Sequence, residues 1–215
     1  MALATGLASA VAACTSSPQP RVYALNNAVD RPAVETPVSL ERPGLQLQRV
    51  LVPDYLDTTD ILLRVGTHEL HESTSGRWGE RLSLGITRAL RADLAGQLAL
   101  DVTSASEPSA NFARQILVNV DAFDVWNDGR CVLIADWTIL DTDRKAVLAT
   151  GRGAFVTPHI RGRNPSDGEI VTGMADAVEQ LSASIARAAK MLPPQDKLRN
   201  AMSNGGGGTV GRDRR

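Results

Sequence analysis

The sequence is poor in aromatic residues, and its charges nearly cancel. Phe, Trp and Tyr make up 4% of the 215 residues, and 23 Lys and Arg stand against 24 Asp and Glu, for a formal net charge of −1. A nucleic-acid binder relies on a basic surface, and one that holds single strands adds aromatic stacking platforms. The composition therefore argues against a nucleic-acid partner.

The chain also lacks an apolar run of the about 20 residues that a membrane-spanning helix needs. This absence excludes a polytopic membrane protein. Hydrophobic residues at 43% and charged residues at 22% are typical of a globular domain, so wholesale disorder is excluded as well. A chain of this length can bury roughly 70% of its unfolded surface around one core.

The N-terminal segment has the features of an export signal. Residues 1–13 carry no charged side chain and are small or apolar throughout. Cys14 follows Val11–Ala13, and small residues before a cysteine are typical of the bacterial lipobox, in which the signal is removed and the cysteine is acylated. No basic residue precedes Arg21, although such signals usually begin with one. The alternative is an apolar N-terminus with an incidental cysteine.

Two polar segments flank the part of the chain that can fold. Residues 15–20 are polar and contain prolines, and the C-terminal end combines a tetraglycine with arginines. Neither segment has apolar groups whose burial would offset the entropy of ordering it. The predicted organisation is a signal peptide (1–13), a lipidated cysteine with its tether (14–22), a folded domain (23–195) and a disordered Gly/Arg tail (196–215).

Between these ends, strand and helix patterns alternate. The first half predicts strands at 45–52, 61–65 and 98–102, and a helix of about 18 residues that starts after a polar loop at 73–76. In the second half, three long strands follow one another between 115 and 157, and Asn127–Gly129 supplies the first turn. A second helix spans 170–192 and ends before Pro193 and Pro194.

This order of elements predicts an α+β fold. We expect a two-layer domain with a mainly antiparallel sheet and two helices on one face. Trp78 opens the apolar stripe of the first helix and Trp137 lies within the second long strand. Both side chains are expected to be buried in the same layer between helices and sheet.

No set of residues predicts catalysis or metal binding. His68–Glu72 lacks the spacing of a zinc-binding HExxH motif and favours a surface hairpin or bulge. Gly151–Gly153 lacks the third glycine of a dinucleotide-binding loop and favours close backbone packing. Cys131 precedes an apolar run and is expected to be a buried hydrophobic residue. No nucleophile, base and oxyanion donor occur together, so the sequence favours a non-enzyme without cofactor or metal.

Taken in order, several short segments resemble those of PqiC/YmbA-type ABC-transport auxiliary lipoproteins. The resemblance covers roughly residues 11–192, and it depends on the order and spacing of the segments. They are Val11–Cys14, Tyr23–Leu25, Val52–Asp57, Ile61–Arg64, Arg77–Leu82, Val120–Phe123, Ala135–Trp137, Gln180–Ser182 and Ile185–Ala186.

The resemblance implies a lipoprotein that is anchored in the outer membrane and faces the periplasm. Its partners would be an MCE-domain protein and the permease and ATPase of a transporter that moves lipids between the two membranes. Thr15 after the lipidated cysteine fits export to the outer membrane. The resemblance also implies self-association in a homo-oligomeric ring.

Two functions remain open at this stage. The first is a docking subunit of the transporter, and the second is a periplasmic lipid-binding carrier with an apolar pocket of its own. For docking, the loop with Tyr55 and Leu56 is the candidate interface, because tyrosine is favoured at binding hot spots. The alternative is that Tyr55 and Leu56 fold back over the core.

The lipobox gives a direct prediction. Cys14→Ala removes the only thiol that could be acylated at this position, so the variant should be neither lipidated nor cleaved. Metabolic labelling with a clickable palmitate analogue should mark the wild-type chain and leave the variant unlabelled. Equal labelling of the two chains would contradict the lipobox.

Overall fold

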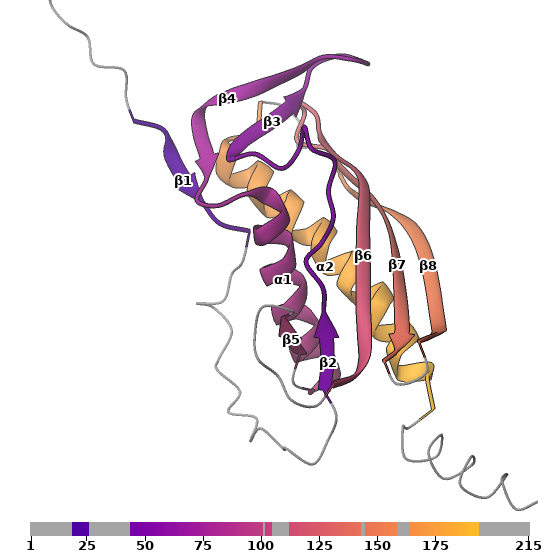
Figure 1. The fold of residues 1–215 in the computed structure, drawn as a ribbon. Helices are drawn as coiled ribbons and strands as arrows, with labels where there is room; N and C mark the ends of the chain where they lie inside the picture. The colour runs from indigo at the N-terminus through magenta and orange to yellow at the C-terminus, as the bar shows by residue number, and fades with distance from the viewer. Residues whose placement is uncertain are drawn as a thin grey trace, which may run out of the picture.

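The structure, a computed structural model, describes residues 19–25, 44–100, 102–104, 112–142, 145–158 and 164–193. These residues form two helices and two β-sheets (Figure 1). The elements are β1 (Arg21–Tyr23), β2 (Gly44–Leu47), β3 (Asp60–Arg64), β4 (Leu70–Trp78), α1 (Leu82–Leu98), β5 (Val102–Ser104), β6 (Phe112–Val125), β7 (Cys131–Asp141), β8 (Ala146–Thr157) and α2 (Asp167–Met191).

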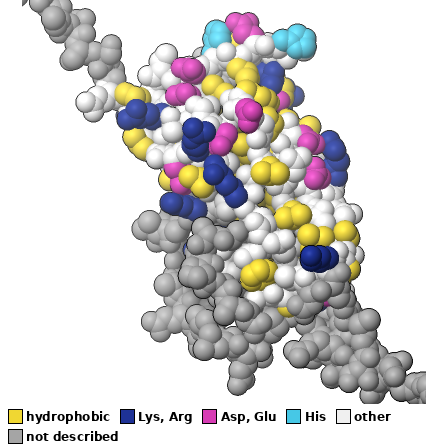
Figure 2. Space-filling view, viewed as in Figure 1, with side chains coloured by type: hydrophobic (Ala, Val, Ile, Leu, Met, Phe, Trp, Pro, Cys, Tyr) yellow, Lys and Arg dark blue, Asp and Glu magenta, His cyan; other side chains and the backbone are white. Residues whose placement is uncertain are grey.

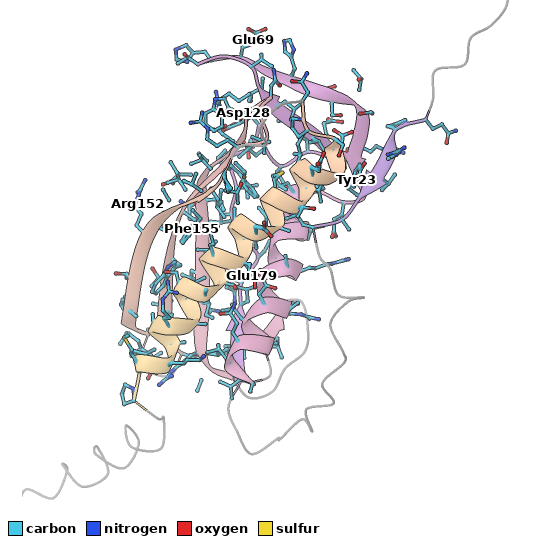
Figure 3. The ribbon with its side chains drawn as sticks, turned by 180° about the vertical axis from the view of Figure 1, so that it is seen from behind. Tyr23, Glu69, Asp128, Arg152, Phe155 and Glu179 are labelled. Carbon is cyan, nitrogen blue, oxygen red and sulfur yellow. The ribbon has the colours of Figure 1, made fainter. Side chains whose placement is uncertain are left out.

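The larger sheet has five strands in the order β5-β2-β6-β7-β8. The three long strands β6, β7 and β8 pair antiparallel, whereas the short β2 runs parallel to both β5 and β6. Gly129 gives the β6–β7 turn its positive φ of 80°. Both helices lie on one side of this sheet (Figures 1 and 3). The predicted α+β fold, with helices layered on one face, is therefore confirmed.

A second, three-stranded sheet has the order β1-β4-β3 and was not predicted. Its central strand β4 contains the serine-rich segment 73–76 that was expected to be a loop, so that expectation was wrong. The Ser73 and Ser75 hydroxyls donate hydrogen bonds of 2.7 and 2.6 Å to the Asp167 carboxylate at the start of α2. Asp167 is distant in sequence, so the polar residues of segment 73–76 predicted a loop, although they form part of β4.

The ends of α1 also differ from the prediction. Trp78 ends β4, and the helix starts four residues later at Leu82. It continues past Gly96 to Leu98, where Ala99 takes a left-handed conformation with φ 50°. The next strand, β5, consequently begins at Val102 and not at residue 98.

Trp78 and Trp137 are both 5% exposed and belong to one hydrophobic core, as predicted, although they come from different sheets. The sequence of the long strands predicts one buried face on each, formed by every second residue: Leu133 to Ile139 on β7 and Ile116 to Ala122 on β6. This alternation is confirmed along β7 from Leu133 to Ile139. Along β6 it holds only as far as Val120. A bulge follows, so Phe123, and not the residue before it, packs into the core.

The Gly151–Gly153 segment lies on β8 beneath two aromatic rings. Gly151 pairs with Trp137 in the sheet, and a Cβ atom added to Gly151 would overlap the Trp137 indole. A Cβ on Gly153 would lie 2.9 Å from Cζ of Phe155. The glycines therefore provide the close packing that the sequence indicated, because ring atoms occupy the positions that a Cβ atom would take.

Gly151→Ala should lower the free energy of unfolding by about 1–3 kcal/mol, because the new methyl group displaces the buried Trp137 ring. Gly96→Ala is the matched control: nothing lies within 4 Å of its added Cβ, and alanine should stabilise α1 by about 1 kcal/mol. Urea unfolding of the two variants measures both effects. Equal effects of the same sign would show that the indole does not fill the space over Gly151.

Candidate docking surface

The loop that precedes β3 divides its residues between the core and the surface. The Pro53 carbonyl accepts hydrogen bonds from the amides of Leu56 (2.9 Å) and Asp57 (3.3 Å), which closes a turn. This turn directs Leu56 into the core, where it is 3% exposed, and leaves Tyr55 46% exposed. Leu56 is thus a core residue and is no longer a candidate for the interface, whereas Tyr55 remains a candidate.

Asp57, which lies in the loop before β3, caps the N-terminus of α1. Arg81 stands at the N-cap of α1 and makes no side-chain capping bond. Instead, Oδ1 of Asp57 accepts the amide of Ser83 at 3.1 Å, and Oδ2 lies 3.4 Å from Arg49 and 3.7 Å from Arg81. Partial burial alone would raise the pKa of Asp57, but the hydrogen bonds from Ser83 and the two arginines outweigh it, so this pKa is lowered.

Tyr55 lies close to an ion pair where the two sheets meet. Nη2 of Arg64, on β3, is 2.6 Å from Oδ1 of Asp124 on β6, and both side chains are only 16% exposed. Burial, followed by the nearby charge of Asp124, raises the pKa of Tyr55. The phenol is therefore neutral at physiological pH, and its exposed edge is available for contact.

The turn that joins β6 to β7 lies beside this ion pair. Trp126 forms an isolated bridge with Arg64, and the Arg130 guanidinium lies 4.3 Å from the centre of the Trp126 ring. We call Tyr55, Arg64, Asp124, Trp126 and Arg130 the junction surface. Tyrosine, tryptophan and arginine are the residue types enriched at binding hot spots.

Trp126 and Arg130 were not predicted as interface residues from the sequence. A signal was present, because the two residues flank Asn127–Gly129, and residues that flank a tight turn face each other across the hairpin. The amide of Trp126 indeed donates to the Arg130 carbonyl at 2.9 Å.

The sheet face away from the helices is a second exposed surface, and Figure 2 shows hydrophobic side chains dispersed over it. Val147 and Val156 at the two ends of β8 are 62% and 49% exposed, and Leu117 on β6 is 38% exposed. Between them, Arg152 forms an ion pair with Asp121. Hydrophobic and charged side chains alternate on this face, whereas the residue types enriched at binding hot spots lie together in the junction surface.

The other residues singled out in the sequence show no catalytic arrangement. Cys131 is fully buried, and burial together with Asp124 raises the pKa of its thiol to about 12, as suits a packing residue. His68 and His71 lie on the exposed β3–β4 hairpin, and no group of three metal-ligating side chains forms in the described ranges. Cys14 lies outside the described residues. Among the helices described, neither is long and apolar enough to cross a membrane.

A family model described as "ABC-type transport auxiliary lipoprotein component" matches residues 23–186. The chain belongs to this family. The match covers both sheets except Arg21 and Val22 of β1, and it covers α2 as far as residue 186, so both exposed surfaces lie on the family's own domain. A search of curated proteins finds no match for this auxiliary lipoprotein.

Solved structures share the fold of this auxiliary lipoprotein. A crystal structure titled only as an uncharacterized protein has 22% identity and a TM-score of 0.58, with 79% of this chain and 98% of that chain covered. A Xanthomonas campestris protein has 14% identity and a TM-score of 0.55, with coverage of 78% and 90%. At these identities the likeness extends to the fold alone.

The capping role of Asp57 makes stability depend on pH. The pKa of this carboxyl is lower in the folded chain than its unfolded value of about 3.9, so its contribution is complete above that pH and is lost as pH falls through the folded pKa. Asp57→Ala should therefore cost about 0.5–2 kcal/mol at pH 7 and progressively less below pH about 4. Asp54→Ala, an exposed carboxylate in the same loop, is the control and should stay within about 0.5 kcal/mol at every pH. A pH-independent loss in Asp57→Ala, measured by urea unfolding, would contradict capping by the charged carboxylate.

Proposed function

We propose that this protein is a non-catalytic docking subunit of an MCE-type lipid transport system. Acylated at Cys14, it would be held on the periplasmic face of the outer membrane. There it would bind an MCE-domain protein whose permease and ATPase lie in the inner membrane, and so support membrane integrity. The observation that carries the proposal is the family match, since an auxiliary component of ABC-type transport acts through a transporter.

The packing between helices and sheet favours docking over the alternative of a lipid carrier. A chamber for an acyl chain would leave its lining side chains accessible to a water-sized sphere. The side chains at the centre of this layer are instead fully buried, so they do not line a cavity. They include Leu90, Leu94, Ile116, Leu133, Ile139, Leu181 and Ile185, each 0% exposed.

The junction surface is the docking site that we propose on this domain. Tyr55 offers a large contact area with few rotatable bonds, and the nearby Arg64–Asp124 pair links β3 of the small sheet to β6 of the large one. A preorganised surface of this kind loses little entropy when it binds. We further propose that copies of the chain associate in a ring, as the resemblance to PqiC/YmbA-type lipoproteins implies.

Tyr55→Ala tests the docking site. Because the Tyr55 side chain is half exposed, the variant should keep a melting temperature close to that of the wild type. If Tyr55 is a hot spot, the variant should lose at least about 2 kcal/mol of binding free energy, a roughly 30-fold weaker Kd for the MCE partner. Pull-down of the lipidated protein from its own membranes, followed by titration with the purified partner, measures this loss.

Leu56→Ala is the matched control, because its buried side chain should reduce stability by about 2–5 kcal/mol. A Tyr55→Ala chain that is as stable as the wild type and captures the MCE protein equally well would exclude the junction surface. If the intact wild-type lipoprotein captures no MCE protein, the proposed partner itself is wrong.

A further inference from the structure

The first described strand is fixed firmly to the body of the domain. The Tyr23 carbonyl, at the end of β1, accepts the amide of Gly79 at 2.8 Å. Its ring packs where Gly76 leaves room, since a Cβ on Gly76 would lie 2.8 Å from Cε2 of Tyr23. The same ring reaches Gly168 in the first turn of α2. These contacts fix β1 beside the N-terminal end of α2 (Figure 3).

The chain between the anchor and β1 is short. Arg21 follows Cys14 by seven residues, which span at most about 25 Å when fully extended. By comparison, the 25 residues of α2 extend the domain by about 37 Å away from β1. An acylated Cys14 consequently keeps the β1 end close to the bilayer, whereas the end of α2 at Met191 can lie far from it.

The exposed edge at β1 has a chemistry that suits lipid headgroups. Val22 is 60% exposed, and it pairs in register with the exposed Arg77 of β4. Arg21 is exposed beside it, and neither arginine forms an ion pair with a carboxylate of the described part of the chain. Figure 2 shows arginine and hydrophobic side chains close together in the region of β1. Each such arginine near an anionic membrane surface contributes about 1 kcal/mol of attraction.

The other projection at this end of the domain is less suited to a membrane. The β3–β4 hairpin carries the exposed acids Glu69 and Glu72 near its tip, with His68 and His71 between and beside them. Carboxylates are repelled by anionic headgroups. The β1 edge has a carboxylate beside it, Asp60, which pairs in register with Arg77 and accepts the Thr58 hydroxyl at 2.7 Å, so Arg21 and Arg77 still leave this edge more basic than the hairpin tip.

We infer that Arg21, Val22 and Arg77 form a membrane-contact edge that rests on phospholipid headgroups. In this orientation the axis of α2 leads away from the bilayer. The inference depends on the proposed acylation of Cys14, and it adds which surface of the domain faces the lipid.

Energy transfer to a labelled bilayer tests the orientation. The full-length lipoprotein is reconstituted in vesicles of phosphatidylethanolamine and phosphatidylglycerol that contain a headgroup-labelled acceptor lipid. A donor dye is placed on Val22→Cys or on Met191→Cys, which is 83% exposed at the far end of α2. Acylated Cys14 and fully buried Cys131 leave the introduced thiol as the one that reacts. Transfer should be several-fold stronger from position 22 than from position 191.

A longer tether shows whether the stronger transfer from position 22 comes from contact of the edge with the bilayer or only from the short tether. Inserting about 20 Gly and Ser residues between Ser17 and Pro18 gives the domain freedom to rotate. The stronger transfer from position 22 should persist in this chain, and it should disappear when Arg21→Glu and Arg77→Glu are added. Its loss on lengthening alone would overturn the contact edge.

The state of Cys14 is measured in the same samples by mass spectrometry. Equal transfer from the two positions, or stronger transfer from position 191, in fully acylated protein would overturn the orientation while leaving the anchor intact. A chain that is not acylated would contradict the anchor and the orientation together.

Discussion

The Asp167 carboxylate holds the two parts of the molecule together. It accepts the Ser73 hydroxyl on one oxygen and the Ser75 hydroxyl on the other, so a strand of the small sheet is tied to the first turn of α2. The carboxylate also lies at the positive end of the helix macrodipole, where a negative charge is favourable. There is no room for a side chain beside it: a Cβ on Gly76 would lie 2.6 Å from Oδ2 of Asp167.

Several features of the domain depend on this attachment. β4 is the central strand of the small sheet, so fixing it to α2 also fixes β1 and β3. β3 in turn presents Arg64 to Asp124 on the large sheet, and β1 takes its place at the end of α2. The junction surface thus includes Arg64 of β3, whereas the membrane-contact edge includes Arg21 and Val22 of β1, and β4 lies between these two strands. A partner could bind the first while lipid headgroups occupy the second.

In the loop at residues 53–57, adjacent residues have different roles. Leu56 fills the core and Asp57 caps α1, while Tyr55 remains half exposed between two structural neighbours. The turn at Pro53 fixes the backbone of Tyr55, and about half of its side chain stays outside the core. This separation is what a docking residue requires, because its side chain can be optimised for a partner at little expense of stability.

The sequence by itself determined the α+β class, the second helix and the three long strands, because the periodicities of buried residues at those places are long and regular. It also predicted that Trp78 and Trp137 are buried and that Gly151–Gly153 packs closely. It could not predict the small sheet, since Ser73 and Ser75 are polar in sequence and acquire their partner only when Asp167, more than 90 residues later, comes beside them. Nor could it separate Tyr55 from Leu56, because a turn at Pro53 decides which of two adjacent side chains faces the core. Local patterns record burial that repeats along the chain, whereas single contacts between distant residues exist only in the tertiary structure.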